Sequence, residues 1–507
     1  MVDPGAVRRC DVLVVGAGFA GLGLARQLKR AGIDDVVVLE RGSRLGGTWR
    51  DNIYPGVACD VPTPLYSYSF ALQPFRSRAT PHGWSGLYAP HDELQAYLER
   101  CADTFDVRRH LQLGVDVRSA SWDGLTARWR VETEQAAEGG QRGAVARCYA
   151  PRVLVSASGH ALRVPITPRF PGAERFRGVQ VHSARWDPTL DLRGRRVVVV
   201  GTGASAAQLV PAIADRVGHL TVFQRTAGWV IPKFQLRDAE QLESVDRVPG
   251  GHRALRWSLY WLMELIAAGH VFEPRLHEWF TEPRALRHLD AQVADPALRE
   301  KLRPRFRLGC KRMIISNDFY PALTRPNVSL VTEPILAFDE SGVLTEDGQH
   351  HAADVVIYAT GYEAAEAPLP FEIEAHGRRL EDAWRDGSEA HRGTAVTGFP
   401  NLFFMVGPNT GQGHTSMVFM MESQYPYVAA GVRQMLDSLR GLEVRPEAQD
   451  AWNRFLEQRL SRTVWNSGGC KSWYLSRSGR NTTAWPGFTF EYWLRLRRFD
   501  RENFRAV

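Results

Sequence analysis

The sequence predicts an α/β protein with two Rossmann-like dinucleotide-binding domains and an α-helical insert in the second of them. A β-branched run followed by a glycine-rich loop and a helical pattern occurs twice along the chain. The stretch 235–304 lacks strand alternation, as expected of helices. The chain has 507 residues, which is too long for one hydrophobic core, so more than one domain is expected.

The first glycine-rich loop follows the apolar run 12–15 and contains Gly16, Gly18 and Gly21. Glycines at these positions permit a tight turn and a close backbone approach, and the N-terminus of the next helix receives a pyrophosphate. The following apolar run ends at Glu40, where a carboxylate accepts hydrogen bonds from a ribose 2′-OH. This βαβ unit is therefore predicted to bind FAD, whose ribose 2′-OH is free.

The second glycine-rich loop repeats the pattern, but a basic residue stands where the first unit has the acid Glu40. It contains Gly201 and Gly203, and Arg225 lies as far beyond Gly201 as Glu40 lies beyond Gly16. An acid would repel a 2′-phosphate, whereas a guanidinium pairs with it, so this unit is predicted to bind NADPH. The residues expected at this cofactor are Gly201, Gly203, Ala204, Ser205, Arg225 and Thr226.

Two short apolar runs, 153–159 and 354–362, end in small residues and bracket the second nucleotide unit. They suggest a nucleotide domain inserted into a flavin domain that resumes after it. The predicted segments are 1–158 (FAD domain, first part), 159–234 (NADP domain, first part), 235–304 (helical insert), 305–357 (NADP domain, second part) and 358–507 (FAD domain, second part).

Charge and cysteine usage argue against several other classes of protein. The net charge of +7 comes almost entirely from arginines scattered along the chain, which suits a solvated surface with some phosphate binding, and no nucleic-acid partner is expected. None of the six cysteines is spaced CxxC. This argues against zinc or a dithiol redox motif and favours isolated buried thiols in a reducing, cytoplasmic compartment. No signal-peptide pattern opens the chain.

The longest apolar stretch, 255–272, is interrupted by Glu264. Its apolar core is short for a membrane span. A buried or amphipathic helix is therefore favoured over membrane contact, and no stable membrane insertion is expected.

Three further motifs resemble those of one family. The stretch 176–187 reads FxGxxxHxxxWD, and 46–60 reads GGxWxxxxYPGxxxD. The segment 308–323, LGCKRMIISNDFYPAL, resembles the one that carries the family's Lys-Arg pair. Together they resemble the type I Baeyer–Villiger monooxygenases, which are class B flavoprotein monooxygenases. The absence of CxxC separates the chain from the disulfide reductases, which share the two nucleotide folds.

The resemblance implies roles for residues outside the glycine-rich loops. Asp60 is expected to hold Arg312, whose permanent charge would stabilise a peroxide anion as an oxyanion donor does. Lys311 is implied at the 2′-phosphate. Gly47 and Trp49 are expected along the flavin, and Trp473, in a C-terminal segment similar to one branch of the family, is also assigned to cofactor binding. Catalytic roles are thus implied for Arg312, Asp60 and His182.

His182 lies between the end of the run 153–159 and the second glycine-rich loop. We interpret it as a residue of the hinge between the two domains, which together with Trp186 couples this hinge to NADP binding. Gly178 would permit the turn and Asp187 would anchor it. An ordinary loop histidine is the alternative.

The function implied by the resemblance is an NADPH- and O2-dependent conversion of a ketone to an ester or lactone through a C4a-peroxyflavin. A lipophilic ketone is the expected substrate, bound between the segment 414–419 and the helical insert, and the protein is expected to be a monomer or weak oligomer. An N- or S-oxygenating flavin monooxygenase is the first alternative, although it should lack the Trp-Asp ending and the 46–60 block. A non-enzymatic flavoprotein is the second, but it has no use for Arg225.

Overall fold

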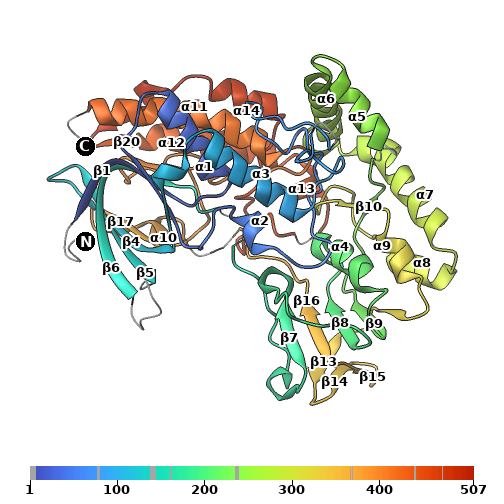
Figure 1. Cartoon of the computed structure of the whole chain (residues 1–507). Helices are drawn as coiled ribbons and strands as arrows, with labels where there is room; N and C mark the ends of the chain where they lie inside the picture. Colours follow the sequence, from blue (N-terminus) through green and yellow to red (C-terminus); the bar gives the residue numbers. More distant parts are fainter. Residues whose placement is uncertain are drawn as a thin grey trace.

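The computed structural model describes residues 7–76, 80–136, 144–159, 163–234, 239–365, 367, 369–438, 441–470 and 472–507. Two sheets organise the chain, and helices cover them (Figure 1). This mixed α/β architecture is the predicted fold class, and each glycine-rich loop belongs to a different sheet.

The larger sheet has nine strands in the order β18-β17-β4-β5-β6-β1-β2-β3, with β19 paired to β6. Its central strands β1 and β2 are parallel and buried along most of their length, because helices including α1 and α11 cover one face and residues of β4, β5 and β17 pack against the other. The strands are β1 (Arg8–Val15), β2 (Val36–Glu40), β3 (Leu111–Leu113), β4 (Val115–Asp123), β5 (Arg128–Ala136), β6 (Ala144–Ser156), β17 (Glu372–Ala375), β18 (Arg378–Arg379) and β19 (Leu402–Phe404).

The second sheet is parallel throughout and has the order β12-β9-β8-β16-β7. Its strands are β7 (Val179–His182), β8 (Arg196–Val200), β9 (His219–Phe223), β12 (Val328–Val331) and β16 (Val355–Tyr358). Strands from both flanks of the helical insert thus pair in one sheet, as an inserted domain requires. The exact domain boundaries stay a prediction.

The insert is helical, and it lies along the flank of the molecule beside the second sheet (Figure 1). It comprises α5 (Ala239–Arg247), α6 (Gly251–Val271), the π-helical turn η5 (His277–Thr281), α7 (Glu282–Gln292) and α8 (Pro296–Leu302). One face of α6 is buried and includes Tyr260, Glu264 and His270, whereas the opposite face exposes Trp257 and Trp261. Among the helices of the described ranges, none has the length and hydropathy of a membrane span.

The remaining elements connect or cover the sheets. The helices are α1 (Phe19–Arg30), α2 (Thr48–Asp51), α3 (His91–Thr104), α4 (Ala204–Ile213), α9 (Phe319–Leu323), α10 (Leu380–Ala383), α11 (Met417–Asp437), α12 (Pro446–Leu460), α13 (Val464–Ser467) and α14 (Thr489–Arg495). The short strands are β10 (Val230–Ile231), β11 (Ile314–Ile315), β13 (Ile335–Phe338), β14 (Gly342–Thr345), β15 (His350–Ala352), β20 (Leu442–Val444) and β21 (Phe504–Ala506).

The expectation of isolated thiols is wrong for two cysteines. Cys310 and Cys470 form a disulfide across a sequence separation of 160 residues. Cys10, Cys59, Cys101 and Cys148 remain free thiols. Cysteine spacing could not reveal the pair, because only the tertiary fold brings the C-terminal segment against the segment that precedes β11.

Candidate active site

The first glycine-rich loop is shaped by close backbone approaches. Gly16 has φ +107°, and a Cβ there would lie 2.6 Å from the carbonyl oxygen of Ala157. Gly18 is the N-cap of α1. A Cβ added to Gly47 would lie 3.3 Å from the Cα of Gly18. The chain around Gly47 therefore closes over the start of α1. These side-chain-free positions leave the helix N-terminus open to a pyrophosphate, as FAD requires.

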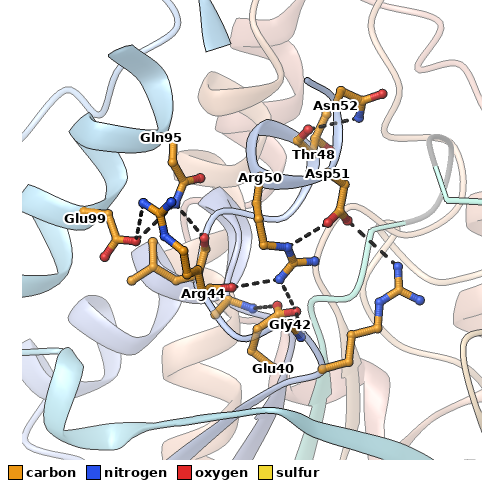
Figure 2. A network of polar contacts seen from close by, with 12 residues as sticks. Glu40, Gly42, Arg44, Thr48, Arg50, Asp51, Asn52, Gln95 and Glu99 are labelled. Carbon is orange, nitrogen blue, oxygen red and sulfur yellow. Dashed lines mark hydrogen bonds and ion pairs between the residues drawn. The ribbon is translucent and has the colours of Figure 1, made fainter. Parts of the chain in front are cut away.

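Glu40 organises the turn beyond β2 (Figure 2). One carboxylate oxygen accepts a hydrogen bond from the Ala17 N–H at 3.0 Å, and the other accepts from the Gly42 N–H at 2.8 Å and from Arg50 at 2.5 Å. The sequence identified Glu40 but not its partner Arg50. A carboxylate has about four lone-pair sites, so Glu40 retains capacity for a ribose hydroxyl while it fixes the loop.

The second glycine-rich loop repeats the geometry of the first. Gly201 has φ +112°, and a Cβ there would lie 2.6 Å from the carbonyl oxygen of Ala359. Gly203 is the N-cap of α4, which begins at Ala204, and a Cβ on Gly203 would have no described atom within 4 Å. Ser205 lies half-buried in the first turn. The N-terminus of α4 is therefore accessible to a second pyrophosphate.

Two cations stand together beside this loop. Arg225 and Thr226 are exposed just beyond β9, and Lys311 is half-buried. Burial and then the charge of Arg225 lower the pKa of Lys311. No ion pair links either cation to an acid in the part of the chain that the structure describes. Two cations that influence each other and have no acidic partner among the described residues are suited to a dianion such as a 2′-phosphate.

The 46–60 segment bridges the two nucleotide units. The Tyr54 hydroxyl donates to Gln208 Oε1 at 2.9 Å, and Gln208 belongs to α4. Gly56 has φ +81°, and a Cβ there would lie 2.5 Å from the carbonyl oxygen of Gln208. Trp49 of the same segment is buried, and its place along the flavin stays a prediction. The Tyr-Pro-Gly part of the motif thus sets how closely α4 approaches.

Asp60 and Arg312, which are 252 residues apart, form a paired contact at the end of this bridge. The Arg312 Nη2 donates to both carboxylate oxygens at 2.7 Å, and Nε donates to Oδ2 at 3.1 Å. The charge of Asp60 raises the pKa of Arg312, so the guanidinium stays protonated. Hydrogen bonds from two guanidinium nitrogens to one carboxylate hold the Arg312 side chain in one orientation and keep its positive charge at one place.

Several buried polar side chains of the 46–60 segment and of the stretch 412–474 have no protein hydrogen-bond partner. Trp465 lies against Gly413, and its ring is 5.9 Å from that of Tyr474, a buried tyrosine close enough to Arg312 to influence its pKa. Buried polar groups almost always have a partner, so this set indicates a ligand rich in hydrogen-bonding atoms, and a flavin ring with its substrate fits it. The unpartnered groups are the side chains of Trp49, Gln412, His414, Thr415, Trp465 and Tyr474.

Three buried histidines extend this cluster into the helical insert. The rings of His414 and His270 lie 6.1 Å apart, and His270 Nδ1 lies 3.0 Å from His277 Nε2. Burial lowers the pKa of His270 to about 4 and that of His277 to about 3, with His270 contributing to the latter. The sequence pointed to His414 as pocket-lining but gave no signal for His270, His277, Trp465 or Tyr474, because these residues meet only through tertiary contacts.

The histidine pair makes stability dependent on pH. In an unfolded chain histidines take up protons near pH 6.5, but the buried pair stays neutral down to about pH 4. The unfolded state therefore binds more protons between these values, and stability is lost as the pH falls from 6.5 towards 4. We expect His277→Gln to flatten the dependence of Tm on pH between 7 and 5, measured by scanning calorimetry. The exposed control His82→Gln should retain the wild-type slope, and an unchanged slope in His277→Gln would contradict the assignment.

His182 lies at the end of β7. Its Nδ1 accepts the Ala184 N–H at 3.0 Å, and its ring meets Tyr362 edge-on at 6.1 Å. The Tyr362 hydroxyl donates to Asn52 at 2.7 Å, so His182 touches a chain of contacts that ends in the bridging segment. The described partners of His182 do not include Arg312 or Asp60, and its role stays a prediction.

The neighbours of His182 serve the same turn. Trp186 packs against the core of the second sheet, and Asp187 accepts both the N–H and the hydroxyl of Thr189. A Cβ on Gly178 would collide with the carbonyl oxygen of Asp354. The role of this turn in coupling a hinge to NADP binding stays a prediction.

Trp473 is half-buried and stacks on Tyr474 with 4.4 Å between ring centroids. It follows shortly after Cys470, whose disulfide partner Cys310 immediately precedes Lys311 and Arg312. The disulfide thus connects the C-terminal segment to the backbone that carries Lys311 and Arg312.

Loss of this disulfide should destabilise the protein, because removing a crosslink typically costs about 2–4 kcal/mol. We expect dithiothreitol to lower the Tm of the wild-type protein by several degrees. Cys470→Ser should start at the lower Tm and show no further loss on reduction. Cys148→Ser is the matched control and should respond to reduction as the wild type does. A wild-type Tm unaffected by reduction would contradict the crosslink.

The comparisons with known proteins agree with this geometry. Residues 9–239 match the family model described as flavin-binding monooxygenase-like. A Baeyer–Villiger monooxygenase of Streptomyces coelicolor is 42% identical over 98% of this chain and 92% of its own length, and one of Pseudomonas aeruginosa is 39% identical over 99% and 93%.

Solved structures give the same result. The structure of an oxidized steroid monooxygenase bound to NADP has a TM-score of 0.81 and 31% identity, covering 98% of this chain and 99% of that one. OTEMO in complex with FAD and NADP has a TM-score of 0.83 and 26% identity, covering 99% and 100%. Fold and site define a flavoprotein monooxygenase with two nucleotide-binding units. Within that class, the chain belongs to the Baeyer–Villiger monooxygenases.

Proposed function

We propose that the protein is an FAD-dependent monooxygenase that uses NADPH and O2 to convert a ketone to an ester or lactone. The Arg312–Asp60 pair carries this proposal, because it fixes a permanent positive charge where the two nucleotide-binding units meet. The names of the relatives in the family support the same reaction. A lipophilic ketone is the proposed substrate class, and the cytoplasm remains the proposed location.

The chain's own residues would hold the two cofactors at their nucleotide ends. Gly16, Gly18 and Gly21 would admit the FAD pyrophosphate to the N-terminus of α1, with Glu40 at the ribose. Gly201, Gly203, Ala204 and Ser205 would do the same for NADPH at α4, with Arg225, Thr226 and Lys311 at the 2′-phosphate. When bound, the flavin takes a hydride from NADPH and activates O2.

Arg312 would stabilise the negative charge that develops on oxygen as the ketone is attacked. It needs no reorganisation to do so, because Asp60 holds its guanidinium in place before the reaction begins. Asp60 acts through Arg312 and is therefore a positioning residue. The side chains of Trp49, Gln412 and His414 are buried and have no protein hydrogen-bond partner, so they would be available to orient the flavin and the substrate carbonyl.

The purified protein tests the proposal directly. It should release FAD and not FMN on denaturation. NADPH oxidation should accelerate with a panel of cyclic and linear ketones and remain at its basal rate with a tertiary amine or a thioether. Acceleration by the amine or thioether alone would assign the protein to the N- or S-oxygenating monooxygenases instead. Release of FMN alone would contradict the cofactor assignment.

A further inference from the structure

The outer face of α6 is apolar, although it lies on the surface. Side chains four residues apart on a helix share one face, and on this face Trp257, Trp261 and Leu265 are 54%, 55% and 72% exposed. Leu262 beside them is 42% exposed. Soluble surfaces carry isolated apolar side chains without consequence, but a contiguous apolar patch marks an interaction site.

Helix α14 extends the same surface. The ring of Trp261 on α6 lies 5.9 Å from that of Phe490 on α14. Trp493 and Leu494 follow Phe490 by three and four residues, so these three side chains share one face of α14. Phe488 lies 5.2 Å from Phe490 and 4.9 Å from Phe272. The two helices thus share one surface, called the aromatic face below. It consists of Trp257, Trp261, Leu262, Leu265, Phe272, Phe488, Phe490, Trp493 and Leu494.

Within the segments 251–272 and 489–498 the exposed charges are all positive, and the exposed acid Glu273 directly follows Phe272. In 251–272 and 489–498, which the structure describes throughout, the exposed charged residues are Arg253, Arg495, Arg497 and Arg498. The two acids of these segments are withdrawn from the surface. Glu264 is buried and bonded to Thr489, and Glu491 is paired with Arg459 at 2.8 Å.

We propose that the aromatic face docks the protein on an anionic lipid surface, with α6 lying in the plane of the headgroups. Tryptophan is enriched at membrane interfaces because one part of its ring is apolar and another donates a hydrogen bond. Arginines at the rim are attracted to anionic headgroups, each contributing near the surface. This combination of an apolar face and a basic rim is the pattern of interfacial helices.

The position of α6 links the docking surface to the site. Its outer face carries Trp257 and Trp261, while its inner face carries His270, whose ring lies 6.1 Å from that of His414. A lipophilic substrate held in a membrane would therefore lie on the opposite side of α6 from His270 and His414. The docking itself does not depend on the proposed function, because it follows from the surface alone.

A second copy of the chain is a poorer occupant. Most homo-oligomers form twofold contacts in which the same patch meets itself. Such a contact would bring the rims that carry Arg253, Arg497 and Arg498 in the two copies together, and like charges across an interface oppose association.

Vesicle co-sedimentation of the FAD-loaded full-length protein tests the proposal. Vesicles of phosphatidylcholine with phosphatidylglycerol should bind the protein, pure phosphatidylcholine should bind it at least roughly tenfold more weakly, and raised salt should weaken binding. The variant Trp257→Ser/Trp261→Ser/Leu265→Ser should lose binding by at least roughly tenfold. Arg253→Glu/Arg497→Glu/Arg498→Glu should abolish the preference for the anionic vesicles.

The controls separate a surface effect from a folding defect. Leu125→Ser and Leu336→Ser remove exposed leucines elsewhere, 100% and 48% exposed, and should bind vesicles as the wild type does. All variants should keep the wild-type FAD content and Tm. The proposal would be overturned if the wild type and the triple variant Trp257→Ser/Trp261→Ser/Leu265→Ser bound vesicles equally. It would also be overturned if the wild type bound neither kind of vesicle. A concentration-dependent dimer in solution that the same variant abolishes would assign the face to a second copy.

Discussion

Arg312→Ala should stop ester formation while NADPH oxidation continues, with hydrogen peroxide released in place of ester. Removing a preorganised donor from a developing oxyanion typically costs about 100- to 1000-fold in rate, and we expect ester formation to fall by that factor. Hydride transfer needs only contact between the two bound nucleotides, so flavin reduction should persist. The measurement is ester yield, peroxide yield and NADPH consumption in one reaction.

Several variants define the specificity of this effect. Arg312→Lys keeps the charge but loses the fork to Asp60, so it should retain intermediate activity. Asp60→Ala should give a milder loss than Arg312→Ala, and the double variant should be far from additive because the two residues act as a unit. Arg307→Ala, which removes an exposed arginine paired with Glu278 at 3.5 Å, is the matched control. Ester formation by Arg312→Ala near the wild-type rate would show that the charge is not used.

Arg225→Ala should raise the KM for NADPH by about 10- to 100-fold and leave that for NADH nearly unchanged. A hydrogen bond to a charged group contributes about 1.5–3 kcal/mol, and each 1.4 kcal/mol is about tenfold in affinity. NADH has no 2′-phosphate and cannot lose this contact. Steady-state kinetics with both nucleotides at a saturating ketone concentration gives the two values.

The neighbouring cation provides a second test of the same site. Lys311→Ala should also raise the KM for NADPH, since Lys311 is close enough to Arg225 for the charge of Arg225 to lower its pKa. Arg216→Ala removes another exposed arginine outside the proposed contacts and should change neither KM. A wild-type protein that used NADH as well as NADPH would contradict the assignment of the second nucleotide unit.

Local backbone requirements explain why the fold class and the two nucleotide loops could be predicted. Gly16 and Gly201 each lie at a positive φ with a neighbouring carbonyl 2.6 Å from where a Cβ would be, so sequence and geometry are coupled at those positions. The pairing of Asp60 with Arg312 came from the family resemblance, because no local pattern connects residues 252 positions apart.

The residues that sequence reasoning missed are those whose partners depend on tertiary packing. His270 and His277 lie in the insert and acquire their setting only when α6 packs beside His414. Arg50 reaches Glu40 because the 46–60 segment folds back over β2. The pairing of Cys310 with Cys470 also depends on tertiary packing. The prediction that these two cysteines are free thiols is wrong, because spacing along the chain does not report distance in space.

Isotope incorporation tests the central claim most directly. The wild-type protein, supplied with NADPH, a simple cyclic ketone and 18O2, should yield a lactone that carries one 18O atom in the ring, located by mass spectrometry of its fragments. The account requires this because oxygen is inserted between the carbonyl carbon and its neighbour. Recovery of the ketone unchanged across a panel of cyclic and linear ketones, together with 18O in the N-oxide of an added amine, would contradict it.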